Sequence, residues 1–244
     1  MKHPRLRDSK HLLAHEIYPI NEFPEEIIKK IGRQLVYLKC VGRNDLAGND
    51  WGDVFAEAIG GQHHNSPLGL TDVTLDKMAW SMKTIKNDKP HTTKAVMRLI
   101  IGRNATDFSF DIKDPYKDIQ ATGTAVLKIW NDRVNIAYNQ YTTLRTSVLV
   151  RNFESLTFSL FEEETHQFVP SAYQWKLNKN NNFEGFDIET GKKRFTWQPN
   201  GTQFTVHVPI PKNSYKFKIK LPPKLDVDET LQQINYNDDW VEIL

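Results

Sequence analysis

Apolar residues recur at steps of three and four in four stretches of this chain, and this spacing predicts four helices. The first should begin near Pro24, with acidic residues in its first turn. The second should end where Gly60 and Gly61 follow it. We expect these helices at residues 24–38, 49–59, 91–101 and from 114 or 117 to 138.

Elsewhere apolar and polar residues alternate in short runs rich in β-branched and aromatic side chains, a pattern that predicts strands. The dipeptide Asn200-Gly201 lies between two such runs and strongly indicates a hairpin turn. We expect strands at residues 142–150, 155–163, 173–177, 183–188, 194–198, 203–209 and 215–221.

This succession of helices and strands predicts an α/β fold of the α+β kind, with an additional β-rich C-terminal portion. We divide the chain into a core with an N-terminal helical arm, residues 1–165, and a β-rich portion, residues 166–244, packed together as one domain. The first 24 residues are polar and contain three prolines, so we expect an arm with one short helix around residues 9–17. The last 20 residues should form an acidic, partly helical tail.

Composition narrows the class of protein only modestly. The net charge of +2 is close to neutral, so any nucleic-acid-binding surface must be local. The single cysteine, Cys40, excludes an internal disulfide and favours the reducing cytoplasm. No apolar run is long enough to cross a bilayer, so we expect a cytoplasmic protein without a membrane partner.

The side chains that best suggest chemistry lie between residues 69 and 86. Two short apolar runs are separated by a turn at Asp76-Lys77. If they fold as a hairpin, Asp72 lies near Ser81 and Lys83. A carboxylate beside a lysine on the neighbouring strand is typical of a site for a hard divalent cation and a phosphate.

This spacing resembles that of the PD-(D/E)XK nuclease superfamily, to which most type II restriction endonucleases belong. In that family an Asp at the end of one strand is followed by acid-x-Lys on the next strand. Here Asp72 follows Thr71, where the family has proline, and Ser81-Met82-Lys83 stands where acid-x-Lys is expected. The resemblance covers roughly residues 48–110.

The resemblance implies a restriction-endonuclease-like mixed central sheet flanked by helices, and Mg²⁺-dependent hydrolysis of double-stranded DNA by a type II restriction enzyme. Asp72 would hold the cation, Lys83 would orient or deprotonate the attacking water, and Ser81 would hold a water. Such enzymes are usually homodimers, because a palindromic site has twofold symmetry. A cognate DNA methyltransferase encoded nearby is a further expectation.

Because Ser81 cannot supply negative charge, a second carboxylate must come from elsewhere. In the nuclease family the helix before the Asp strand often carries a Glu that points into the metal site, and Glu57 is the residue that this similarity selects, with Asp53 second. The alternative is that both belong to a solvated acidic helix face. His63 and His64 follow; a phosphate contact and an exposed loop are both open, and a zinc site lacks enough ligands.

A DNA-contacting surface is expected mainly in the C-terminal portion, where basic residues far outnumber acidic ones between 175 and 224. Lysine and arginine would neutralise phosphates, and glutamine and asparagine are suited to read base edges. The alternative is a lysine-rich solvent face that discourages edge pairing between strands. The residues that we select are Lys86, Arg98, Lys192, Lys193, Arg194, Gln198, Asn200 and Gln203.

Two other classes of function compete with the nuclease. One is a non-catalytic DNA-binding protein with a decayed nuclease fold, which the serine at position 81 favours. The other is an enzyme or interaction domain unrelated to nucleic acid, in which Asp72 and Lys83 form a structural ion pair.

Overall fold

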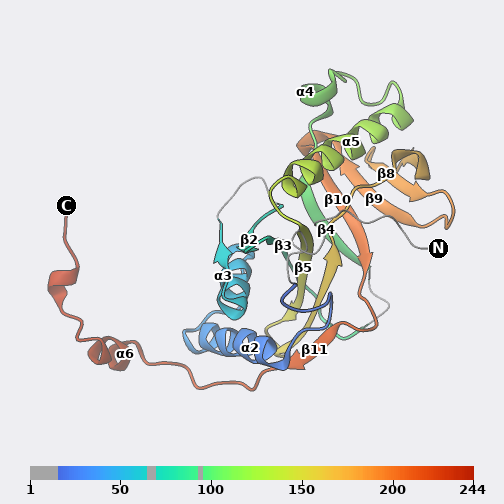
Figure 1. Ribbon diagram of the computed structural model, residues 1–244. Coiled ribbons are helices and arrows are strands. Elements are labelled where there is room, and N and C mark those ends of the chain that lie inside the picture. The colour runs from blue at the N-terminus through green and yellow to red at the C-terminus, as the bar shows by residue number, and fades with distance from the viewer. Residues whose placement is uncertain (1–15, 65–69, 93–95) are drawn as a thin grey trace, which may run out of the picture.

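The computed structural model describes residues 16–64, 70–92 and 96–244, and it contains two β-sheets with helices packed against them (Figure 1). The predicted α+β class, with a mixed sheet and a β-rich C-terminal portion, is therefore confirmed. Within the described residues, no helix is both long enough and apolar enough to span a membrane.

The first sheet is mixed, and we call it sheet A. Its strands lie in the order β1-β2-β3-β5-β6-β11, and every neighbouring pair is antiparallel except β3 and β5, which are parallel. The long helix between β3 and β5 in the chain supplies the crossover that a parallel pair requires. The strands are β1 (Gln62–His63), β2 (Val73–Leu75), β3 (Met78–Lys86), β5 (Thr143–Asn152), β6 (Thr157–Glu164) and β11 (Tyr215–Lys218).

The second sheet, sheet B, is antiparallel throughout and has the order β4-β10-β9-β8-β7. Each sheet draws strands from both sides of residue 165, because β4 joins sheet B and β11 joins sheet A. The strands are β4 (Val96–Arg103), β7 (Tyr173–Leu177), β8 (Phe183–Asp187), β9 (Lys193–Gln198) and β10 (Gln203–Pro209).

The prediction of a helix at residues 91–101 is wrong, because most of this stretch forms β4. Burial alternates along it: Met97, Leu99 and Ile101 face the core, whereas the intervening side chains are exposed. This run contains apolar residues at a helical spacing (Val96, Leu99 and Ile100) and others at a strand spacing (Met97, Leu99 and Ile101). Pairing with β10 decides between the two structures. Residues 93–95 lie outside the described part of the chain.

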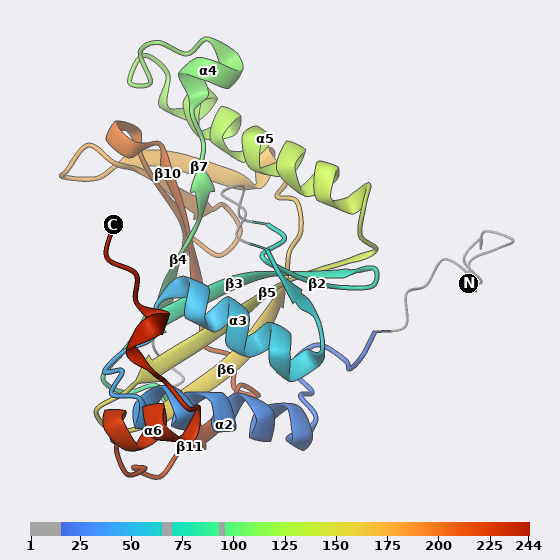
Figure 2. The ribbon, with the colours of Figure 1, turned by 90° about the vertical axis from the view of Figure 1, so that its left-hand side faces the viewer.

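Two helices cover one face of sheet A, and sheet B with the long helix α5 lies on the other side (Figure 2). Val73, Trp80 and Met82 point into a core shared with α2 and α3, whereas Ala79 and Val148 point into a second core shared with sheet B and α5. The helices are α2 (Glu25–Cys40), α3 (Gly48–Ile59), α4 (Thr106–Phe110), α5 (Ile119–Tyr138) and α6 (Val227–Gln233), with 3₁₀ turns at Pro170–Ala172, Pro199–Gly201 and Asp238–Trp240.

The other predicted helices and strands lie where the pattern placed them, with ends that shift by a few residues. Tyr173–Leu177 and Gln203–Pro209 have the predicted bounds. The helix expected near residues 9–17 lies almost wholly outside the described residues.

A buried charged network attaches the segment before α2 to sheet A. The Glu162 carboxylate accepts hydrogen bonds from the Tyr18 hydroxyl (2.8 Å), the Trp80 indole (2.7 Å) and the Arg145 guanidinium (2.8 Å). The Asn21 side chain donates to the Glu162 carbonyl oxygen and accepts from the Glu162 N–H. Glu162 lies in the part of β6 that β11 does not pair with. Burial of such a charge is tolerated because every oxygen has a partner.

Candidate active site on the β2–β3 hairpin

The two-residue turn at Asp76-Lys77 folds β2 back on β3 and sets the register of the candidate site. Asp76 has a positive φ of 51°, a conformation that aspartate tolerates better than most residues. Val73 pairs with Trp80, so Asp72, one residue earlier, lies opposite Ser81. Both side chains therefore point away from the α2–α3 core and toward the side of sheet B.

Asp72, Ser81 and Lys83 are brought together as the sequence predicted. One carboxylate oxygen of Asp72, Oδ2, accepts hydrogen bonds from the Met82 backbone N–H at 2.7 Å and from the Ser81 hydroxyl at 3.4 Å. The same oxygen lies 3.9 Å from Lys83 Nζ. The proximity is thus observed, and the catalytic roles of the three residues stay predictions.

The lysine of this group is largely removed from water. The Lys83 and Asp72 side chains are 19% and 16% exposed. Burial lowers the pKa of the Lys83 ammonium, and the nearby Asp72 carboxylate acts in the opposite direction. A partly buried lysine with a lowered pKa is the kind of group that functional sites use, although structural ion pairs share this property.

Glu57 does not join Asp72, contrary to the expectation of a second carboxylate from the preceding helix. Its carboxylate is directed at α2, where it accepts from Gln34 and lies 3.4 Å from Arg33. Asp53 instead contacts His63 at 2.7 Å. Within residues 16–64, 70–92 and 96–244, no group of three or more His, Cys, Asp or Glu side chains is placed to hold a metal ion.

The position of His64 was not anticipated. Its backbone N–H donates to the Asp72 carbonyl oxygen at 2.7 Å, and its Nε2 lies 2.7 Å from the Thr74 hydroxyl. His63 pairs with Val73 and points to the opposite side, toward Gly52 in α3. The adjacent histidine pair was visible in the sequence, but only the short pairing of β1 with β2 assigns the two rings to different faces.

Four of the selected DNA-binding residues gather on the outer face of sheet B, which points away from the core; Arg98 and Lys193 are exposed there, and Gln198 and Gln203 are half-buried. Arg98 pairs with His207, and Gln203 pairs with Gln198 across the turn that also holds Asn200. Lys193 extends over the same face and forms a 3.0 Å ion pair with Glu184. Lys192 and Asn200 are exposed in the turns at either end of β9, and Lys86 ends β3 within 3.8 Å of Glu154.

Arg194 lies on the opposite side of sheet B from the surface for which it was selected. Gly185 pairs with Phe195 and Phe186 with Lys193, so Arg194 is the extra residue of a β-bulge. A bulge re-aims the side chain that it carries. The guanidinium donates to the His207 carbonyl at 2.9 Å and lies 3.7 Å from the Glu163 carboxylate, which leaves it poorly placed for DNA.

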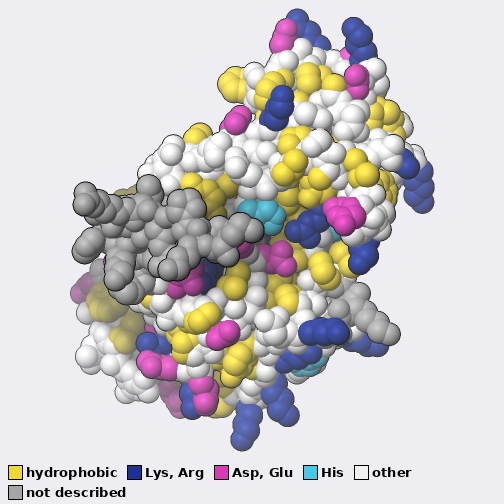
Figure 3. Space-filling model, turned by 45° about the vertical axis from the view of Figure 1, so that its right-hand side comes forward, with side chains coloured by type: hydrophobic (Ala, Val, Ile, Leu, Met, Phe, Trp, Pro, Cys, Tyr) yellow, Lys and Arg dark blue, Asp and Glu magenta, His cyan; other side chains and the backbone are white. Residues whose placement is uncertain are grey.

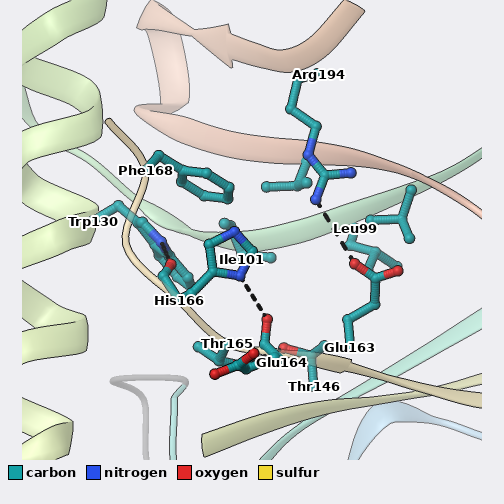
Figure 4. A pocket seen from close by; sticks show the side chains of 12 residues that line it. Leu99, Ile101, Trp130, Thr146, Glu163, Glu164, Thr165, His166, Phe168 and Arg194 are labelled. Carbon is teal, nitrogen blue, oxygen red and sulfur yellow. Dashed lines mark hydrogen bonds and ion pairs between the residues drawn. The ribbon is translucent and has the colours of Figure 1, made fainter. Parts of the chain in front are cut away.

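Arg194, Glu163 and His166 are among the residues that line a small pocket between the two sheets (Figure 4). Apolar residues such as Leu99, Val206 and Phe168 form part of its lining, and Thr146 and Thr165 are among its polar lining residues. Burial raises the pKa of the Glu163 carboxyl, and Arg194 opposes that effect. In Figure 3 charged and histidine side chains surround a hollow in the middle of the molecular face.

No protein-family model matches the chain, and no curated protein and no solved structure is significantly similar to it.

Proposed function

We propose that this protein is a Mg²⁺-dependent endonuclease that hydrolyses phosphodiester bonds of double-stranded DNA, of the type II restriction enzyme class. The observation that carries the proposal is the meeting of Asp72 and Lys83 on neighbouring strands of a mixed sheet, 3.9 Å apart and largely buried. It agrees with the resemblance of the Asp72 and Ser81-Met82-Lys83 spacing to the PD-(D/E)XK pattern.

The protein groups around Asp72 suit Mg²⁺ only if substrate oxygens and water complete its coordination. Mg²⁺ is commonly held by one or two carboxylates together with substrate phosphates, and Asp72 is the carboxylate here. When bound, the cation would supply charge neutralisation at the phosphate and a more acidic water. Asp72 binds, Ser81 orients the Asp72 carboxylate, and Lys83 stabilises charge that develops on the phosphate oxygens.

The DNA partner is supported by the polar residues on the outer face of sheet B. Arg98 and Lys193 supply positive charge there, and Gln198 and Gln203 supply paired donors and acceptors for base edges. A homodimer and a neighbouring cognate methyltransferase belong to the same proposal, because a palindromic target is matched by a twofold axis.

The direct test is incubation of the purified protein with unmethylated phage DNA and Mg²⁺, beside an EDTA control and a Lys83→Ala variant. We expect discrete fragments that disappear in both controls. If the DNA stays intact over a wide range of salt and cation conditions, the endonuclease proposal fails.

A second candidate is a non-catalytic DNA-binding protein. It is favoured by the serine at position 81 and by the direction of Glu57 toward α2, which together leave Asp72 as the one acidic side chain of the predicted set at the hairpin. Salt-dependent retention of DNA without cleavage would select this function over the nuclease.

A further inference from the structure

Side chains alternate between the two faces of sheet A along β1, β2 and β3. Gln62 pairs with Thr74 and His63 with Val73, and the His64 N–H bonds the Asp72 carbonyl, so His64 stands opposite Asp72. Because Val73 points into the α2–α3 core, Asp72 and His64 point to the other side of the sheet. In Figure 2 that side of the β2–β3 hairpin is turned toward sheet B.

The His64 ring has one hydrogen-bond partner among the described residues. Nε2 lies 2.7 Å from the Thr74 hydroxyl, and no described residue bonds Nδ1. When Nε2–H donates to the Thr74 oxygen, Nδ1 carries the lone pair. Metal-binding histidines are usually oriented by a hydrogen bond of this kind from the other ring nitrogen.

The two oxygens of the Asp72 carboxylate, which faces His64, differ in their contacts. Oδ2 of Asp72 is engaged by the Met82 N–H, the Ser81 hydroxyl and Lys83, whereas no described residue bonds Oδ1. His64 and Asp72 thus stand opposite each other on the same side of sheet A, and among the described residues neither Nδ1 of His64 nor Oδ1 of Asp72 has a partner.

We infer that His64 is the second protein ligand of the cation that Asp72 holds, in place of the carboxylate that Ser81 lacks. This inference rests on the proposed function for the choice of Asp72 as a ligand. It changes the expected cation: Mg²⁺ prefers oxygen ligands, whereas imidazole favours divalent transition-metal cations. Mn²⁺, which accepts both, should therefore bind more tightly than Mg²⁺.

The test is calorimetric titration of the full chain with Mn²⁺ and with Mg²⁺, in the absence of DNA and at a pH where imidazole is neutral. For His64→Ala we expect Mn²⁺ affinity to fall at least about tenfold and Mg²⁺ affinity to change much less. Thr74→Val should weaken Mn²⁺ binding in the same direction, because the ring loses its orienting acceptor. His91→Ala, at an exposed turn position, is the matched control and should bind as wild type does.

Pulsed EPR of bound Mn²⁺ supplies a readout that does not depend on a variant folding: the wild type should show nitrogen coupling from imidazole. Equal Mn²⁺ affinity in wild type and folded His64→Ala, absence of nitrogen coupling, or no Mn²⁺ binding by the wild type would each overturn the inference. DNA cleavage with Mn²⁺ affinity independent of His64 would leave the nuclease proposal standing and remove this one. His64-dependent Mn²⁺ binding without DNA cleavage would support His64 as a ligand and overturn the nuclease proposal.

Discussion

Acidic side chains that form ion pairs in this protein differ greatly in their exposure to water. Glu162 is 1% exposed and bonds Tyr18, Trp80 and Arg145, whereas the Glu184 side chain is 19% exposed and pairs with Lys193. Removing one partner of a buried pair strands the other charge, while the Glu184–Lys193 pair, whose lysine side chain is 38% exposed, is partly screened by solvent.

We therefore expect Glu162→Gln to lower the free energy of unfolding by about 3 kcal/mol. The matched variant Glu184→Gln should lower it by about 0.5 kcal/mol. Urea denaturation followed by circular dichroism measures both. Similar losses for the two variants would contradict the importance given to the buried network.

His207 gives the protein a predictable dependence on pH. Burial, reinforced by the positive charges of Lys193 and Arg98, lowers the pKa of this imidazole from 6.5 to about 4. The folded state therefore binds fewer protons than the unfolded state between these values, so stability should rise as the pH increases through that window.

The expected gain across this window is on the order of 2 kcal/mol after allowance for solvent screening. His207→Gln keeps a polar side chain beside Thr196 but cannot titrate, so the variant should lack this component. Unfolding free energies of the two proteins from pH 4 to pH 6.5 provide the measurement, and parallel curves would exclude the effect.

Helix α5 packs closely on β7 because Gly123, at the contact with Trp175, has no side chain. A Cβ at Gly123 would lie 2.2 Å from Trp175 Cγ, whereas a Cβ at Gly32 in α2 would meet nothing within 4 Å. Alanine favours a helix over glycine by up to about 1 kcal/mol, but overpacking a core costs roughly 1–3 kcal/mol.

Gly123→Ala should accordingly be destabilising and Gly32→Ala stabilising, although both changes are the same chemically. Thermal unfolding distinguishes them by the sign of the shift in Tm. A rise in Tm for Gly123→Ala would show that α5 does not sit against Trp175 as described.

The local sequence pattern was sufficient to predict most helices and strands and the proximity of Asp72 to Lys83. A hairpin with a two-residue turn has a register set by its own residues, so no distant information was needed. The strand β4 could not be obtained in this way, because its partner β10 is about a hundred residues further along the chain. Tertiary pairing overrides an ambiguous spacing of apolar residues.

The side-chain directions that were missed share one physical origin. The bulge that turns Arg194 toward Glu163 and the contact between α2 and α3 that engages Glu57 both depend on packing between elements. Nor does periodicity reveal that His64 faces Asp72, because β1 has only two residues. Such features follow from the assembled sheet and not from any single segment.

Across the protein surface, the outer face of sheet B should dominate binding of duplex DNA. The logarithm of the DNA-binding constant falls linearly with the logarithm of salt concentration, and each phosphate contact that is lost makes this slope shallower by about one. Arg98→Ala combined with Lys193→Ala should therefore weaken binding and reduce the slope by about two. The control pair Lys29→Ala and Lys30→Ala removes two charges from α2, where each pairs with a glutamate, and should leave the slope unchanged.

Fluorescence anisotropy with a labelled duplex at several salt concentrations gives these slopes. If the α2 pair proved as damaging as the sheet B pair, the DNA surface would have to be assigned elsewhere.

Single-turnover cleavage of DNA measures whether Asp72 and Lys83 form a hydrolytic centre. Wild type, Asp72→Asn and Lys83→Met should be compared with Mg²⁺ and with Mn²⁺, after each variant is shown to unfold cooperatively and to bind DNA. The proposal predicts cleavage by the wild type and a loss of at least about a hundredfold in both variants, with DNA binding retained. Cleavage at the wild-type rate by folded Lys83→Met, or none by the wild type with either cation, would contradict it.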